Sequence, residues 1–300
     1  MGSKDIVEKT LEGYNDVFAD IVNVLLFGGK QLVNPDDLED QLPRSVYKAD
    51  GNIHEMERDV VKRWKKRNIR IACIGMENQT IADPYMTLRV GGYDGSEYRA
   101  QMIRRDEQRR NEQPMDVPYP VITLVLYFGY EKQWKAPRTL YEALDIPEEL
   151  KPYVNDIRLN LFEIAWLTDE QVGMFQSDFR IVADYFVQMR KNRDYDPGRD
   201  VAKHIEAVMD LLKVMDQDYR FELQKDETGA EEVPKTMSEW LTRKLGESEN
   251  KGKAEGVSVG EDRLASLISR LSALGRNEDI LKVADNKDYR EKLYAELGIA

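Results

Sequence analysis

The 300-residue sequence contains one cysteine, Cys73, and two histidines, His54 and His204. A single cysteine excludes an intramolecular disulfide and is typical of a protein from a reducing compartment, so we expect a cytoplasmic location. We interpret Cys73 as a small core residue, because no histidine near it in sequence could activate a thiol nucleophile. The two histidines lie far apart in sequence, which disfavours a histidine-based metal site or a Ser-His-Asp triad.

Long apolar runs are also lacking. No stretch approaches the roughly 20 consecutive apolar residues that a transmembrane helix needs, and the N-terminal residues MGSKDIVEK contain no apolar block of a signal peptide. The G-x-x-x-x-G-K-[ST] phosphate loop is missing, and the glycines of GGYDG lack the strand-turn-helix setting of a dinucleotide fingerprint. We therefore expect neither a membrane protein nor a nucleotide-cofactor enzyme.

Charge is plentiful but uneven. Charged residues make up 33% and apolar residues 41% of the chain, which is typical of a globular protein, and the net charge is −12. That charge argues against a nucleic-acid binder. Residues 55–110, however, contain thirteen Lys/Arg against nine Asp/Glu, a local excess of +4 that leaves −16 for the rest. This basic island is either a phosphate-binding face or a solvated helix surface.

Hydrophobic periodicity predicts an α/β core followed by a helical region. An acidic, proline-containing loop (NPDDLEDQLP) and a short strand in SVYK are expected after the first helix. The expected elements are, in order, a helix at 5–29, strands at 59–64 and 69–76, a helix at 84–111, strands at 120–129 and 157–167, and helices at 169–192, 200–225 and 236–247.

Composition divides the chain into four parts. We expect an α/β domain over 1–168, a helical extension over 169–247, a polar and glycine-rich linker over 248–260, and a helical tail over 261–300.

Two acidic residues stand at the ends of the first two core strands. Asp59 opens one predicted strand and Glu77 closes the next, so pairing of the strands as a hairpin would place the two carboxylates side by side at one rim of the sheet. Two carboxylates, a carbonyl and waters suit Mg²⁺ or Mn²⁺. Gln79 points to the same face as Glu77, because side chains alternate along a strand. The alternative is ordinary: acidic residues at strand ends are usually solvated.

Several strings of the sequence occur in the order of a known family: ERDVVKRW, IRIACIGMENQ, LRVGGYDGSEYRAQM, YPVITLVLYFG and LDIPEELKPYVNDIRLNLFEI. Over residues 14–166 they resemble the recombination-promoting nuclease (Rpn) / transposase family of the PD-(D/E)XK nuclease superfamily. The ENQ segment and the tyrosine-bearing helix after it are the most specific part. The resemblance implies a restriction-endonuclease-like core, with a central mixed sheet flanked by helices and Mg²⁺ bound at the sheet rim.

The resemblance also implies roles for individual residues. Asp59 matches the metal-binding aspartate, and Glu77 matches the metal-binding glutamate of the E-x-K element. Gln79 stands where many members of the superfamily have lysine, which leaves open how the attacking water is activated. Asp16 matches the region of the first helix that supplies an accessory acidic group, ahead of Asp20.

Residues of the next helix are candidates for the substrate cleft. Tyr93 and Gln101 are eight residues apart and can share a helix face with Tyr98, although the tyrosines are equally interpretable as core aromatics. The basic residues expected to contact the DNA backbone include Arg63, Lys65, Arg89 and Arg99.

Two hypotheses follow. The first is a Mg²⁺-dependent DNA endonuclease, with a role in recombination or mobile elements implied by the resemblance alone. The second is a non-catalytic nuclease-fold protein whose helical extension binds protein partners. The sequence does not separate a DNA substrate from an RNA substrate, and the tail after residue 260 is a candidate for homodimerisation.

Overall fold

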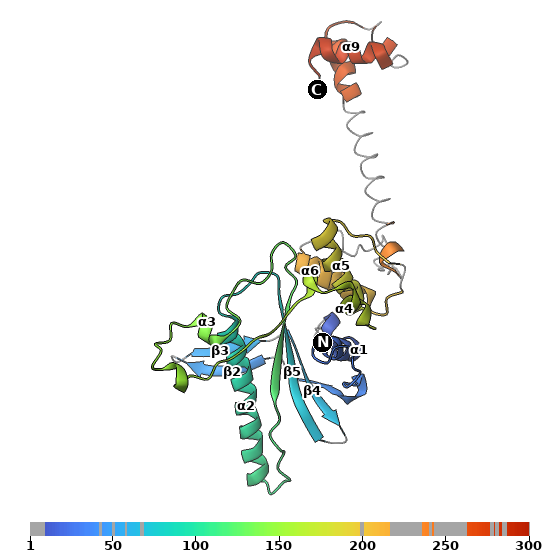
Figure 1. Cartoon of the computed structure of the whole chain (residues 1–300). Coiled ribbons are helices and arrows are strands. Elements are labelled where there is room, and N and C mark those ends of the chain that lie inside the picture. The colour runs from blue at the N-terminus through green and yellow to red at the C-terminus, as the bar shows by residue number, and fades with distance from the viewer. Residues whose placement is uncertain are drawn as a thin grey trace. The chain divides into compact units, whose positions relative to one another are not determined.

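The computed structural model divides into two compact units, Met1–Ser238 and Glu239–Ala300 (Figure 1). The first unit contains two sheets and most of the helices, and the second is helical. The structure describes residues 10–41, 44–49, 52–57, 59–66, 69–198, 201–216, 236–239, 242, 263–276, 279, 282–283 and 287–299.

A five-stranded mixed sheet forms the centre of the first unit. Its order is β1 (Leu38–Asp40), β4 (Val60–Lys66), β5 (Ile69–Gln79), β6 (Val121–Tyr127) and β7 (Asn160–Glu163). The first three strands are antiparallel neighbours, and β5, β6 and β7 run parallel. The α/β class and the predicted strand pair are therefore confirmed. The predicted loop contains the short edge strand β1, which the sequence did not indicate.

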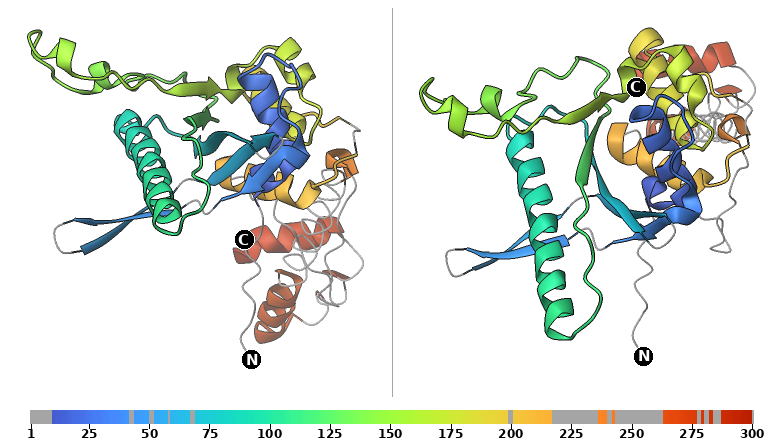
Figure 2. Two further views of the ribbon diagram at one scale, coloured as in Figure 1. Left: turned by 90° about the horizontal axis from the view of Figure 1, so that it is seen from below. Right: turned by 60° about the horizontal axis from the view of Figure 1, so that its bottom comes forward.

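Helices cover both faces of this sheet. Figures 1 and 2 show α2 on one face and α1 with the α4–α6 group on the other. A separate hairpin lies on the α2 side. The bounds are α1 Asn15–Leu25, β2 Arg44–Ala49, β3 Asn52–Glu57, α2 Met86–Arg110, α3 Leu140–Ala143, α4 Asp169–Met174, α5 Phe179–Asn192 and α6 Ile205–Asp216, with 3-10 turns η1 Leu11–Gly13, η2 Pro35–Asp37, η3 Lys151–Tyr153 and η4 Ile164–Trp166.

Four predicted elements differ clearly in extent. The helix predicted over 200–225 begins only at Ile205, as α6, and residues 217–225 lie outside the described residues. The single helix predicted over 169–192 is two helices, α4 and α5, broken at 175–178. The strand predicted over 157–167 is the four-residue β7 followed by η4. The helix predicted over 5–29 is η1 followed by the eleven-residue α1. Residues 1–9 and the predicted linker 248–260 lie outside the described residues.

The α4–α6 layer belongs to the same compact unit as the sheet. Phe128, just after β6, packs with its ring centroid 6.4 Å from that of Phe179 and 5.1 Å from that of Phe186. The buried Asp20 of α1 accepts hydrogen bonds from the backbone of Gln176 (2.8 Å) and Ser177 (2.7 Å). The division between compact units therefore falls at residues 238 and 239, and the helices after 168 complete the core beside α1.

Helix α2 tolerates glycine because the chain after α3 packs close to it. A Cβ at Gly91 would lie 2.7 Å from Cδ1 of Ile157, too close for any larger residue to fit without a shift. Glycine lowers the helix propensity of α2, but at position 91 it allows the helix to pack closely against this segment.

The fully buried Lys62 of β4 fixes the start of α1. Its ammonium group donates to the carbonyl of Gly13 (2.8 Å) and to Oδ1 of Asn15 (2.7 Å), and it forms an ion pair with Asp40 of β1. It also lies 5.6 Å from the ring centroid of Phe18. A buried ammonium needs such partners, because an unpaired one would be very costly to desolvate.

The second unit has an apolar core of its own. Residues 263–273 and α9 (Lys287–Leu297) are helical, which agrees with the helical tail predicted from the sequence. Leu267, Leu271, Val283 and Leu293 pack together with Tyr294.

Among the helices in the described part of the chain, none is both long enough and apolar enough to cross a bilayer.

The environment of Lys62 generates a stability prediction. We expect Lys62→Met to lower the free energy of unfolding by about 3 kcal/mol, because Gly13 and Asn15 would lose a donor in a buried setting. The matched control is Lys65→Met on the same strand, whose ion pair with Glu39 is partly exposed and should contribute less than about 1 kcal/mol. Urea unfolding curves measure both changes, and equal losses in the two variants would contradict the assigned role of Lys62.

Candidate functional site

Asp59 and Glu77 meet at one rim of the sheet, as the sequence predicts. The last residue pair of the β4–β5 ladder is Val60 with Met76, so Asp59 and Glu77 flank it on neighbouring strands. Oδ2 of Asp59 accepts a hydrogen bond from the backbone N–H of Asn78 at 2.6 Å. Asp59 is exposed, whereas Glu77 is only 3% exposed.

Helix α2 supplies the positive partner of Glu77. Arg89 donates to Oε1 of Glu77, to Asp83 (3.0 Å) and to the hydroxyl of Tyr93 (3.1 Å). Burial alone would lower the pKa of Arg89, but hydrogen bonds to Tyr93 and Asp83 and the charge of Glu77 raise it above its usual value. The guanidinium group therefore stays charged beside the buried carboxylate.

Gln79 shares the face of Glu77, as its position two residues further along the strand predicts. Its side-chain amide lies 3.5 Å from Oε1 of Glu77, at the limit of a hydrogen bond. The cation at this place is thus Arg89 from α2, because residue 79 is an uncharged amide.

Glu12 is a site residue that the sequence analysis missed. It lies in η1 and is fully buried; Oε1 accepts from the side-chain amide of Asn78 at 3.0 Å, and Oε2 has no hydrogen-bond partner. Burial raises the pKa of Glu12 to about 7, hydrogen bonds oppose this shift, and the negative charge of Asp59 adds to it. An isolated glutamate near the start of a predicted helix is typical of a solvated residue, so no sequence signal marked it.

Asn78 joins the two acidic groups. Its backbone N–H binds Asp59, and its side-chain amide binds Glu12. Because side chains alternate along β5, Asn78 faces η1 while Glu77 and Gln79 face α2. The ENQ motif therefore has contacts on both faces of the sheet.

The structure does not bring Asp16 to this rim. Asp16 accepts from Lys203 at 2.7 Å and lies 3.2 Å from Nε2 of His204, whose ring stacks on Tyr14 with centroids 3.7 Å apart. These are the side-chain partners of Asp16 within the described residues, and they join α1 to the segment before α6. The acidic group that the N-terminal segment presents to the rim is Glu12, because η1 rather than α1 lies beside Asn78.

The predicted cleft residues Tyr98 and Gln101 bind the backbone at the start of β6. Gln101 is buried and exchanges two hydrogen bonds with the backbone of Tyr119 (3.1 and 3.0 Å). The hydroxyl of Tyr98 accepts from the N–H of Val121 at 3.1 Å. Both residues align α2 with β6, whereas Tyr93, 5% exposed, contacts the site through Arg89.

Most of the arginines and lysines of the basic island whose side chains the structure describes form ion pairs within the chain. Arg63 lies 3.9 Å from Glu97 with a side chain only 12% exposed, and Lys65 pairs with Glu39. Arg99 is exposed and makes no ion pair within the described part of the chain. The island therefore carries less free positive charge than its composition suggests. Further pairs are Arg104–Glu97 and Arg109–Asp106.

The donor set at the rim suits a hard cation. Asp59 and Glu77 offer carboxylate oxygens from adjacent strands, and Glu12 has a buried carboxylate oxygen without a hydrogen-bond donor. Among the described residues, no three His, Cys, Asp or Glu side chains are grouped as a complete metal-binding set. Glu12 and Glu77 lie on opposite faces of β5, so a Mg²⁺ site here would have Asp59 and Glu77 as ligands and water in the remaining positions.

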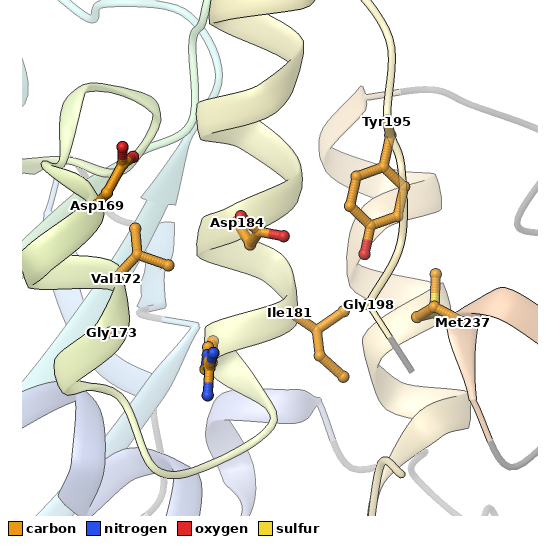
Figure 3. Close-up of a pocket in the computed structure, with 9 residues that line it drawn as sticks. Asp169, Val172, Gly173, Ile181, Asp184, Tyr195, Gly198 and Met237 are labelled. Atoms are coloured by element: carbon orange, nitrogen blue, oxygen red, sulfur yellow. The ribbon is translucent and has the colours of Figure 1, made fainter. Parts of the chain in front are cut away.

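A cavity of about 230 Å³ lies among the helices of the first unit. Figure 3 shows Val172 and Gly173 of α4, Asp184 of α5 and the nearby Tyr195 on its walls. Burial raises the pKa of Tyr195 above its usual value, and Asp184 also has a pKa raised by burial. None of the rim residues lines this cavity, so it is a feature of the helical layer.

Comparison of the chain with protein-family models, with curated proteins and with solved structures gives no match.

The contacts of Asp16 generate a pH prediction. Burial would raise the pKa of Asp16, but hydrogen bonds and charge from Lys203 and His204 lower it below 3.8. A carboxyl group whose pKa is lower in the folded state stabilises the protein at pH values above its unfolded-state pKa of about 3.9. This stabilisation is lost as the pH falls through the folded-state pKa. We expect Asp16→Asn to cost less than about 1 kcal/mol at pH 7, with the difference from the parent protein shrinking as the pH falls below about 4 and disappearing below the folded-state pKa.

Thermal unfolding across this pH range tests the prediction. The control is Asp145→Asn, at an exposed carboxylate without an ion pair in the described part of the chain, and it should leave stability unchanged. A difference between Asp16→Asn and the parent that grows toward low pH would show that the sign is wrong.

Proposed function

We propose that this chain is a Mg²⁺- or Mn²⁺-dependent endonuclease with a PD-(D/E)XK-type core, as its resemblance to the Rpn family implies. The observation that carries the proposal is the meeting of Asp59 and Glu77 at the sheet rim, with the cation Arg89 beside Glu77. The proposed reaction is hydrolysis of a phosphodiester bond in DNA.

The order and direction of the central elements support the proposal. A helix, an antiparallel strand pair, a second helix and a strand parallel to the second of the pair follow one another as α1, β4–β5, α2 and β6. The resemblance implies the same succession. Fold alone does not define chemistry, so the argument depends on the side chains at the rim.

Each residue at the rim has a proposed task. Asp59 and Glu77 would hold the metal ion, which when bound lowers the pKa of water and neutralises phosphate charge. The backbone N–H of Asn78 keeps Asp59 in place. Gln79 would orient a water molecule or a phosphate oxygen by hydrogen bonding. Tyr93 positions Arg89, whose charge would stabilise the negative charge that develops on the phosphate.

Arg89 compensates for the uncharged residue at position 79. In many superfamily members a lysine stands there, and its role includes positive charge near the scissile phosphate. The guanidinium group of Arg89 reaches the same carboxylate, Glu77, from α2. It is 39% exposed at its side chain, so a substrate phosphate can approach it.

One observation favours a second candidate function. Arg89 already neutralises Glu77, so the rim is stable without a metal ion, as a non-catalytic protein-interaction module would require. The proposals of DNA as partner, of a role in recombination and of dimerisation through the tail all depend on the first candidate. The first candidate predicts metal-dependent cleavage of DNA, and the second predicts none.

A plasmid assay tests the endonuclease proposal. We expect the full-length protein to nick or linearise supercoiled plasmid only with Mg²⁺ or Mn²⁺, and Asp59→Ala and Glu77→Ala each to reduce the rate by at least about 100-fold. Asp145→Ala is the control for the loss of an exposed carboxylate and should cleave normally. Equal cleavage by all variants would point to a contaminant. No cleavage by any folded protein, with no metal bound in calorimetry, would favour the interaction module.

A charge-exchange experiment tests the role of Arg89. We expect Arg89→Gln to reduce cleavage by about 100-fold, because the rim then has no cation. Adding Gln79→Lys to that variant should restore part of the rate, since a lysine at position 79 would lie beside Glu77. Circular dichroism serves as the check that both variants fold. If both variants fold and the double variant cleaves no faster than Arg89→Gln alone, the positive charge of Arg89 is not its contribution to cleavage.

A further inference from the structure

A second cavity, of about 490 Å³, opens beside the rim. Residues 80–82, which directly follow Gln79, line one side of it, and residues 127–133, from the last residue of β6 onward, line another. The two sides are joined by a hydrogen bond from the N–H of Phe128 to the carbonyl of Gln79 at 2.8 Å. Because β5 and β6 are parallel, this cavity lies at the strand ends that carry Glu77.

Apolar side chains form much of the cavity. Ile81 is 79% exposed on the side that follows β5, Tyr130 contributes an aromatic ring, and Met215 comes from α6. The volume is within the range of about 300–1,000 Å³ that is typical of sites for small ligands. An exposed isoleucine at the mouth of such a space favours a ligand with an apolar, flat part.

The acidic residues of the cavity are paired. Glu131 binds the guanidinium group of Arg193, and Asp216 accepts from the hydroxyl of Tyr185. The repulsion between these carboxylates and an anionic ligand is therefore reduced.

The lysines of the cavity are not paired. Lys132 and Lys135 are exposed, and neither has an ion pair or a side-chain hydrogen bond within the described residues. In a chain with a net charge of −12, this cavity thus combines apolar walls with two available cations. A ligand that carries a phosphate on a flat ring system matches this cavity, because the phosphate can contact the lysines and the ring can contact the apolar walls.

We propose that this cavity binds an unpaired nucleotide of the substrate, next to the phosphate that is cleaved. The base would lie against Ile81 and Tyr130, and Lys132 and Lys135 would contact its phosphates. A base can enter a cavity of this size only when it leaves the stack of a duplex. The proposal rests on the endonuclease function and names its substrate class: DNA with a single-stranded end or segment.

Binding without cleavage tests this proposal. Fluorescence anisotropy of the full-length protein in EDTA compares a labelled blunt duplex with duplexes that carry a short 3′ or 5′ single-stranded end. We expect at least one end type to bind about tenfold more tightly than the blunt duplex, the size of one base contact. Ile81→Ser should remove this preference, whereas Leu32→Ser, at an exposed leucine outside the cavity, should keep it.

The salt dependence of binding tests the two lysines. Lys132→Ser and Lys135→Ser should each reduce the slope of log affinity against log salt by about 0.7 for a single-stranded contact. Lys30→Ser removes one exposed lysine outside the cavity and should leave the slope unchanged. Equal affinity for blunt and single-stranded ends, or the same effect from Lys30→Ser, would overturn the proposal.

The results separate this inference from the endonuclease function. Plasmid cleavage by a protein without preference for unpaired ends would leave the function standing and refute the cavity assignment. Preference for unpaired ends, lost in Ile81→Ser, without metal-dependent cleavage would support the cavity as a nucleotide site and refute the endonuclease.

Discussion

The buried ammonium group of Lys62 is the contact on which the arrangement of the rim depends. It joins β4 to the carbonyl of Gly13 and to Asn15, and so holds η1 and the start of α1 against the sheet. Glu12 directly precedes Gly13, so the same contact sets the position of a carboxylate beside Asn78. A buried charge is specific in this way because it must be surrounded by acceptors, and few arrangements of the chain provide them.

Three of the acidic side chains described above are compensated by a cation or by backbone N–H groups, and Glu12 is the exception. Glu77 is buried and paired with Arg89, Asp20 accepts two backbone N–H groups, and Asp59 accepts one. Glu12 is buried and has no ion pair within the described residues, and burial raises its pKa to about 7. This exception contacts the ENQ motif through the side chain of Asn78, and unbalanced buried charge is often associated with function.

Much of the central fold could be predicted from local sequence. The β4–β5 pair was predicted from alternating, β-branched residues, and the meeting of Asp59 with Glu77 followed from pairing those strands. The sequence predicted a boundary at residue 168, whereas the helices after it belong to the same compact unit as the sheet. Local patterns could not show this, because the packing of Phe128 against Phe179 and Phe186 joins segments distant in sequence. The β1 edge strand was missed because three residues are too few to show a period.

The sequence by itself determined the β4–β5 pair, the rim and the meeting of Asp59 with Glu77, since the period of side chains along a strand and the pairing of successive strands are local properties. Only the tertiary structure decided which acidic residue of the N-terminal segment approaches that rim, because Glu12 in η1 and Asp16 in α1 face different partners. It also decided that the cation near Glu77 comes from α2, and that β5 and β6 end beside a cavity with two available lysines. These depend on which helix face meets which strand, and long-range packing sets that choice.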